Sequence, residues 1–252
     1  MQGMTTTDQR SRSAPRLVLG TVLTGAALVL ASCGGGAITP ETTPPPGGGS
    51  TELPPVTTPA EQSGRIPGQI TPFTAGQASS VRPEELSESA AVSGSGLFDL
   101  ALPGATTMTT TYADLLFNAT DIFGPCENVI TTAPDSLRLY PIASLKTDTG
   151  QALTANASGS TTAKNWWFAN QDASYTFQGD CLVPGTVNAT FNFKLGWNVL
   201  DVTYSGASTA YAQVAAPTSP VEWRVGGLGS QRLNNALEPW KNSAAYRARH
   251  RN

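Results

Sequence analysis

From residue 96 to residue 227 the chain is a series of short segments in which apolar and polar residues alternate. Alternation of this kind is expected of strands that bury one face and expose the other. Gly196 between two of the segments predicts a tight hairpin there. We therefore expect an all-β domain, an antiparallel sandwich or barrel of about eight short strands. The segments are GLFDLAL, SLRLYPIASL, NWWFAN, SYTFQ, TVNATFNFKL, WNVLDVTYS, TAYAQVA and VEWRVGG.

The chain before this region has a different composition. Residues 34–90 contain ten of the nineteen prolines, together with many Thr and Gly residues and almost no apolar pattern. A segment of this composition cannot bury enough surface to offset the entropy of ordering it. We expect residues 33–90 to be a disordered tether and residues 91–228 to be the β domain.

Residues 229–252 change character again. Leu233, Leu237 and Trp240 have helical spacing, although Pro239 interrupts the pattern. The chain ends YRARHRN, and we interpret residues 229–252 as a short helical, basic tail. Such a tail could contact an anionic polymer, a phospholipid headgroup or an acidic partner, or it could simply fray into solvent.

Residues 1–32 have the layout of an export signal. Three arginines (Arg10, Arg12, Arg16) precede the apolar run LVLGTVLTGAALVLAS. That run is about 16 residues long, short of the ~20 that a helix needs to span a bilayer, so a transmembrane anchor is the weaker alternative.

The tetrad Leu30-Ala31-Ser32-Cys33 resembles the lipobox of bacterial lipoproteins. This resemblance covers the signal only and implies that Cys33 is acylated and becomes the new N-terminus. It also implies an exported protein that is lipid-anchored to the cell membrane or the outer membrane, and acyl chains on one residue add about 0.8 kcal/mol per buried CH₂.

With Cys33 assigned to the lipid, only Cys126 and Cys181 remain. Two cysteines in an oxidising compartment are most simply a disulfide. The alternatives, two free thiols or a pair of metal ligands, would need partners that the sequence lacks. We expect a Cys126–Cys181 bridge.

The sequence excludes several kinds of chemistry. Its one histidine, His250, lies near the C-terminus, so neither a catalytic triad nor a zinc site is expected, and no phosphate or dinucleotide motif occurs. Without the signal, which contains Asp8 and three arginines, the chain has 12 basic and 17 acidic residues. This net negative charge does not indicate that the protein binds nucleic acid. We expect no cofactor and no metal.

Catalysis by carboxylates alone remains possible, because it needs neither histidine nor a nucleotide-binding motif. A glycosidase needs two acids that face each other across a cleft. No spacing singles out a pair among the candidates, which are Asp99, Asp114, Asp121, Glu127, Asp135, Asp172, Asp180 and Asp201.

Tryptophans give the one positive indication of a binding surface. Trp166 and Trp167 are adjacent in a predicted strand, so their side chains point to opposite faces. One can be in the core; the other must be exposed, lie at an edge or meet a second layer. With Trp197, they are the candidates for stacking on a sugar ring or binding a protein, unless the linker or the C-terminal helix covers them.

These observations together predict a non-enzymatic module of the cell envelope. The membrane would hold it through the lipid on Cys33, and its partner would be an envelope polysaccharide or an envelope protein rather than nucleic acid. The alternative is a carboxylate-dependent glycan hydrolase.

Overall fold

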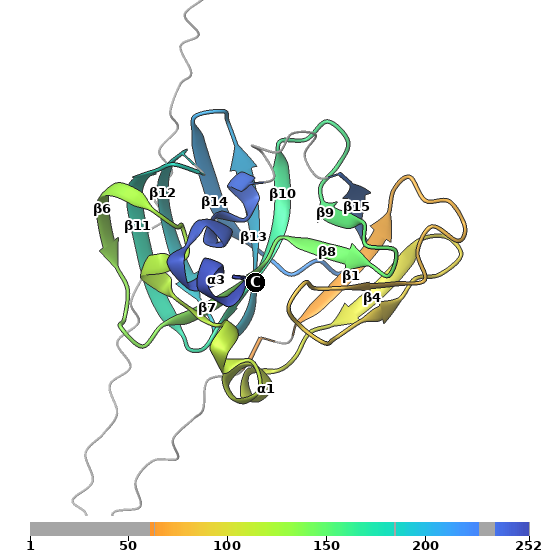
Figure 1. Ribbon diagram of the computed structural model, residues 1–252, viewed down its shortest axis with the longest axis horizontal. Coiled ribbons are helices and arrows are strands. Elements are labelled where there is room, and N and C mark those ends of the chain that lie inside the picture. The colour runs from red at the N-terminus through yellow and green to blue at the C-terminus, as the bar shows by residue number, and fades with distance from the viewer. Residues whose placement is uncertain (1–60, 63, 184, 227–234, 252) are drawn as a thin grey trace, which may run out of the picture. The chain divides into compact units, whose positions relative to one another are not determined.

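The computed structural model of the protein describes residues 61–62, 64–183, 185–226 and 235–251 (Figure 1). These residues belong to one compact unit, Pro55–Asn252. The predicted signal peptide, the acylated Cys33 and the tether up to residue 60 lie outside the described residues. They remain predictions.

Strands dominate the described part of the chain, which confirms the β-rich class. Fifteen strands are connected in one sheet, more than the eight that alternation indicated. Several of the additional strands have only two to four residues, too few to alternate visibly. The first eight strands are β1 (Arg65–Ile70), β2 (Ser80–Arg82), β3 (Ala90–Ala91), β4 (Leu97–Ala101), β5 (Phe117–Asn118), β6 (Cys126–Thr132), β7 (Arg138–Ile142) and β8 (Ser144–Thr147).

The remaining strands complete a mixed sheet. Two of its pairs are parallel, β1 with β15 and β12 with β14, so the expectation of a purely antiparallel sheet is wrong. The later strands are β9 (Ala152–Ala155), β10 (Thr162–Ala169), β11 (Ala173–Cys181), β12 (Gly185–Phe193), β13 (Gly196–Tyr204), β14 (Ser208–Val214) and β15 (Val221–Val225).

Helical structure is short and sits between or after strands. The helices with assigned bounds are α1 (Ala105–Thr110), three 3₁₀ turns at η1 (Ala113–Leu115), η2 (Ala119–Asp121) and η3 (Pro239–Asn242), and α3 (Ala244–Arg249).

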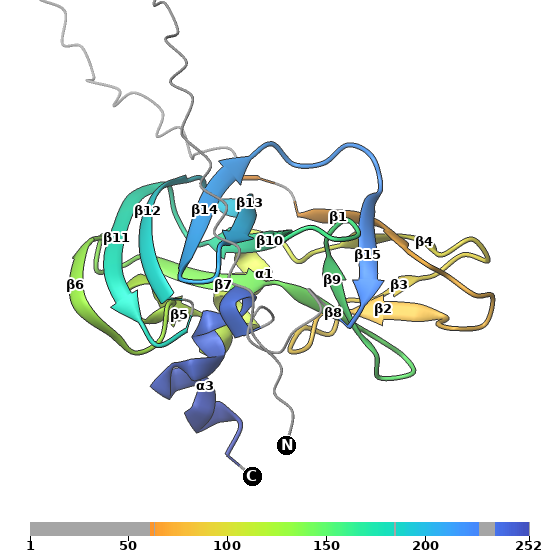
Figure 2. The same cartoon turned by 90° about the horizontal axis from the view of Figure 1, so that it is seen from above.

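Strands β7, β10 and β13 form a wall that is buried on both faces. Figures 1 and 2 show β6, β11 and β12 on one side of β10 and β1, β4 and β15 on the other. Trp167 and Leu200 point into one core, which we call the disulfide-side core. Trp166 and Val199 point into the second, which we call the N-terminal core. Both tryptophan side chains are therefore covered, because a packed layer lies on each face of β10.

The predicted hairpin at Gly196 is wrong. Gly196 has a positive φ of 97° and begins β13. However, β14 lies between β12 and β13, and β13 pairs with β10 and β14 instead. The local hairpin is the next one along the chain, β13–β14, whose turn contains Gly206 with φ 90°.

The folded unit begins earlier than residue 91. Strand β1 lies between β15 and β4, with Ile70 opposite Trp223 and Ile66 opposite Leu100. Both isoleucines are fully buried in the N-terminal core. Residues 65–91 thus contribute β1, β2 and β3 to the sheet, although their prolines made them resemble the tether.

The predicted disulfide is confirmed. Cys126 on β6 lies directly opposite Cys181 on β11, and their sulfurs are 2.05 Å apart. The bridge closes a loop of 55 residues. It joins β6, the last described strand at one end of the sheet, to the strand that pairs with it, β11.

The C-terminal residues dock on the domain. Leu237 and Trp240 are buried in the disulfide-side core. The helical residues 235–237 end before Pro239, which opens η3, so Pro239 interrupts the helical pattern as predicted. Helix α3 follows, with the Ser243 side chain accepting a hydrogen bond from Tyr246 N. The helical prediction is confirmed for these residues, whereas the frayed tail is not observed; Leu233 lies outside the described residues.

Candidate functional site

None of the three tryptophans proposed as stacking platforms is exposed. Trp166 and Trp167 are 1% and 0% exposed. Trp166 stacks on Trp223 at 5.6 Å between ring centroids, and Trp167 stacks on Phe191 at 5.8 Å. Both indoles are therefore core residues, one in each core, because the strand that carries them is covered on both faces.

Trp197 is buried for a different reason. It lies at the start of β13, is 3% exposed and donates its indole N–H to the carbonyl of Pro103 at 2.8 Å. An added Cβ at Gly64 would lie 2.2 Å from the Trp197 ring, so the chain entering β1 passes directly over it. The indole has a structural role at this entry point.

A groove on the outer face of β1 and β4 is the best candidate for a binding site. The two strands are antiparallel, and their outward residues include Arg65, Pro67, Leu97 and Asp99. Their inward residues, such as Leu100, are buried in the N-terminal core. Because the side chains alternate, one face of β1 and β4 packs in the N-terminal core and the other face forms the floor of the groove.

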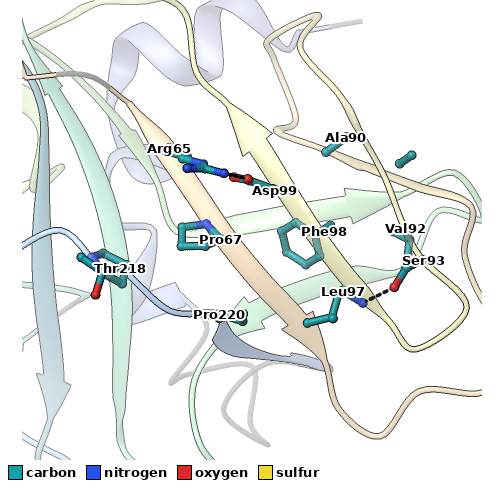
Figure 3. Close-up of a pocket in the computed structure, with 12 residues that line it drawn as sticks. Arg65, Pro67, Ala90, Val92, Ser93, Leu97, Phe98, Asp99, Thr218 and Pro220 are labelled. Atoms are coloured by element: carbon teal, nitrogen blue, oxygen red, sulfur yellow. Dashed lines mark hydrogen bonds and ion pairs between the residues drawn. The ribbon is translucent and has the colours of Figure 1, made fainter.

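Two segments wall the groove (Figure 3). On the β4 side are β3, Val92 and Ser93, and the Ser93 hydroxyl accepts a hydrogen bond from Leu97 N at 3.0 Å. On the β15 side the wall is the loop before β15, with Pro217 and Pro220. The space between the walls is about 900 Å³, the size of a cleft that takes a ligand or a peptide segment.

Phe98 connects the groove to the core. It lines the groove, is 5% exposed and contacts Trp223 with 5.9 Å between ring centroids. Its ring lies across Gly68 on the neighbouring strand, where an added Cβ would come within 2.2 Å of it. The glycine is thus required for close approach, and the floor of the groove rests on packed aromatic rings.

The lining is mostly apolar and has one pair of charged residues. Arg65 forms a two-atom ion pair with Asp99, with side chains 70% and 41% exposed. Leu97 is 40% exposed, one of the few large apolar side chains at the surface of the described residues. A single exposed ion pair contributes little to stability, but it gives the groove a charged point that can orient a ligand.

The groove does not contain the two acids that glycoside hydrolysis requires. Asp99 is the one carboxylate among its lining residues. Elsewhere, Asp201 pairs with Lys164 at 2.6 Å and Asp172 with Lys194 at 3.1 Å. A hydrogen bond from Leu195 N and the Lys194 contact lower the pKa of Asp172.

One pair of candidate acids does meet. Glu127 on β6 lies opposite Asp180 on β11, and both are exposed. Asp180 accepts hydrogen bonds from Asn128 and Thr186, so it is held on an outer strand face. Asp121 accepts a hydrogen bond from the Asn118 side chain. The backbone carbonyls of Asp114 and Asp135 accept hydrogen bonds from Arg249 and Arg138.

The C-terminal charges meet a second cluster of carboxylates. Lys241 contacts Glu84 at 2.8 Å, and Lys146 contacts the same carboxylate at 2.6 Å. Burial alone would raise the pKa of Glu84, but the hydrogen bonds from Lys146 and Lys241 outweigh it and lower the pKa to about 2. Lys241 therefore forms an ion pair inside the domain instead of contributing a free positive charge to the tail.

The end of α3 makes a similar contact with Glu85. Nε of Arg249 is 3.7 Å and Nε2 of His250 is 3.5 Å from the Glu85 carboxylate. The Arg249 guanidinium also lies 4.4 Å from the centroid of the Phe117 ring. Burial raises the pKa of Glu85 despite both neighbours. Arg249 and His250 thus hold the tail onto the domain.

Within the described residues there is no cluster of three or more metal-ligating side chains and no helix long and apolar enough to cross a membrane. No protein-family model matches the chain, and no curated protein or solved structure is significantly similar to it. The groove could not be predicted from the local composition, because Arg65 and Pro67 fall in the proline-rich region. The signal that could have found it is RIPGQI, in which Ile66 and Ile70 alternate with outward residues.

Proposed function

We propose that this protein is a lipid-anchored, non-enzymatic binding module of the cell envelope, held at the membrane through Cys33. The observation that carries the binding role is the groove of about 900 Å³ on β1 and β4. It is open and mostly apolar, with Pro67 in its floor and Pro217 and Pro220 in one wall, so little conformational entropy would be lost there on binding.

The chemistry of the groove favours a protein ligand over a polysaccharide. Sugar rings are usually bound by exposed aromatic faces, but the one aromatic residue in the lining, Phe98, is 5% exposed. Apolar side chains such as Leu97 and Val92 suit an extended polypeptide, and the Arg65–Asp99 pair offers it a charged contact. We therefore narrow the ligand to an envelope protein.

No observation favours the glycan hydrolase. The groove offers one carboxylate, which is paired with Arg65, and the acids that meet across β6 and β11 lie on an exposed strand face.

Site-specific photocrosslinking in the native envelope tests the proposal. The full chain would carry benzoylphenylalanine at Leu97 or, as a matched control, at Val225, which is 44% exposed on β15 and does not line the groove. We expect a discrete protein adduct from position 97 and none from position 225.

Other outcomes would contradict the proposal in distinct ways. A polydisperse adduct that glycan-degrading enzymes collapse would replace the protein ligand with a polysaccharide. The same products from both positions, or none from either, would remove the groove as a binding site.

A further inference from the structure

Strand β6 leaves one edge of the sheet without a partner. It pairs with β11 only, and among the described residues no strand pairs with its other side. Val129 and Ile130 on this strand are 44% and 65% exposed, and Leu182, just after the bridged Cys181, is 84% exposed. These are three of the five large apolar side chains that the described part of the chain exposes.

The far end of the sheet is protected along its whole length, whereas β6 is interrupted only near its start. Strand β3, at the far end, has two residues and is too short to act as a template. Exposed edges are usually blocked by such shortness, by lysine, by proline or by a β-bulge. Strand β6 has seven residues, CENVITT, with no Lys, Arg or Pro and a single charge at Glu127, and its one irregularity lies between Glu127 and Ile130.

This edge is also held in an extended form. The register is irregular near Asn128, which has a φ of 52°, but Ile130, Thr131 and Thr132 pair in regular order with β11. The Cys126–Cys181 bridge fixes the start of the strand. Strand addition at a pre-ordered edge avoids the entropic cost of ordering it on binding.

We propose that β6 is a dimer surface, on which the β6 strand of a second copy of this chain pairs in an antiparallel manner. A two-fold axis at Ile130 would place this residue opposite the partner's Ile130. Val129 would then face the partner's Thr131, and Asn128 the partner's Thr132. These are β-branched and polar pairs of the kind that stabilise sheets.

The charge pattern supports a second copy as the occupant. With the axis at Ile130, Glu127 falls opposite Ala133 of the partner, so the only charged residues of the two strands do not meet. The contact is isologous, and one sequence supplies both sides of it.

The size of the contact predicts a weak dimer. A pair of seven-residue strands is smaller than the ~1,600 Å² of a standard interface. Anchoring at one membrane would raise the effective concentration of the two copies. That enhancement rests on the proposed lipid anchor, but the strand pairing itself is independent of the groove.

Cysteine crosslinking of the full chain in its own membrane tests the dimer. In the proposed register, Ile130→Cys places two β-carbons about 5 Å apart across the axis, which a disulfide can bridge after a small shift. We expect oxidation to give at least a several-fold higher yield of covalent homodimer than from Leu182→Cys. Leu182 is more exposed than Ile130. If accessibility alone decided the yield, Leu182→Cys would therefore give more covalent dimer than Ile130→Cys.

Three results would overturn the proposal. Equal yields at the two positions would indicate random collision. Absence of a dimer while mass spectrometry shows an intact Cys126–Cys181 bridge would exclude the pairing. A crosslink from position 130 to a different protein would assign the edge to another partner. If the new thiol exchanges with the native bridge, benzoylphenylalanine at position 130 gives the same readout without a thiol.

Failure of this test would leave the groove untouched. The two sites lie on different strands and are probed at different residues, 130 and 97.

Discussion

The two cores lie on opposite faces of the same strands, but the chain assembles them differently. Among the described residues, the disulfide-side core takes all of its buried members from positions 117–240, ten of them from β11 to β14, and a disulfide closes its edge. The N-terminal core takes nine of its buried members from positions 66–108 and the other ten from positions 140–223. Only the N-terminal core therefore depends on the segment before residue 117.

This difference has a consequence for function. The groove lies over the distant strands β1 and β4, and its walls come from still other segments. Its shape therefore exists only when the N-terminal core is complete. The free edge of β6, in contrast, belongs to the side of the molecule whose core uses no residue before position 117, and the disulfide holds it.

The largest effect of a single substitution is expected at the shared wall. Trp167→Ala and Trp166→Ala should each lower the free energy of unfolding by about 3–5 kcal/mol, because each removes a fully buried indole. Thermal melts would measure the loss. Hydrogen exchange would separate the cores: Trp167→Ala should deprotect β11 and β12 first, and Trp166→Ala should deprotect β9 and β15 first.

The matched pair also tests whether the wall couples the two cores. Because both residues are on β10, each variant should still unfold in one cooperative transition. Two separate transitions in either variant would show that the cores are independent domains.

Removing the disulfide should have the next largest effect. The double variant Cys126→Ser/Cys181→Ser loses the constraint on a loop of 55 residues, which we expect to cost about 2–4 kcal/mol. Denaturant unfolding would measure it, with wild-type protein under reducing conditions as the control. Because the bridge lies at β6, exchange should increase at β6 and β11 while β1 and β4 stay protected; uniform deprotection would contradict the local role of the bridge.

A smaller, pH-dependent effect is expected at Glu84. Its folded pKa of about 2 is below its ordinary 4.5, so its ion pairs stabilise the fold above pH 4.5, and this contribution is lost as the pH falls from 4.5 to 2. The side chain is 28% exposed, and solvent screening limits the effect to about 1–2 kcal/mol.

The variant Glu84→Gln should therefore be less stable than wild type at pH 7 and nearly equal to it at pH 2. Chemical denaturation at a series of pH values would measure this convergence. Asp99→Asn, which breaks a more exposed ion pair, is the control and should change stability far less. A constant difference between Glu84→Gln and wild type at all pH values would exclude ionisation of Glu84 as the cause.

The same contrast between the cores explains how far the sequence could predict the structure. The β class, the disulfide and most of the strands from residue 97 onward follow from alternation and from counting cysteines, but β5, β6 and β9 do not. Strand β1 was missed because Pro67 and Gly68 interrupt RIPGQI. The proline is tolerated because pairing with β15 begins only at Gly68, after the residue that lacks an N–H.

The tryptophans show a second limit of local patterns. Adjacent Trp166 and Trp167 indicate opposite faces correctly, but whether the second face meets solvent or another layer depends on β1, β4 and β15. Likewise, the pairing at Gly196 could not be predicted, because β14 inserts between β12 and β13 only in the folded sheet. The sequence of one strand does not indicate which strand, distant along the chain, will pair with it.

Two chains that start at residues 61 and 91 would show whether residues 65–91 complete the N-terminal core. These residues include β1, which forms the floor of the groove together with β4, and β3, which contributes to one wall. Near-UV circular dichroism would report the packing of the buried tryptophans. We expect a native spectrum and a cooperative melt for 61–252, and loss of both for 91–252, because Trp223 and Phe98 would lose their cover from β1. A native spectrum and an unchanged melt for 91–252 would show that the core does not need these residues.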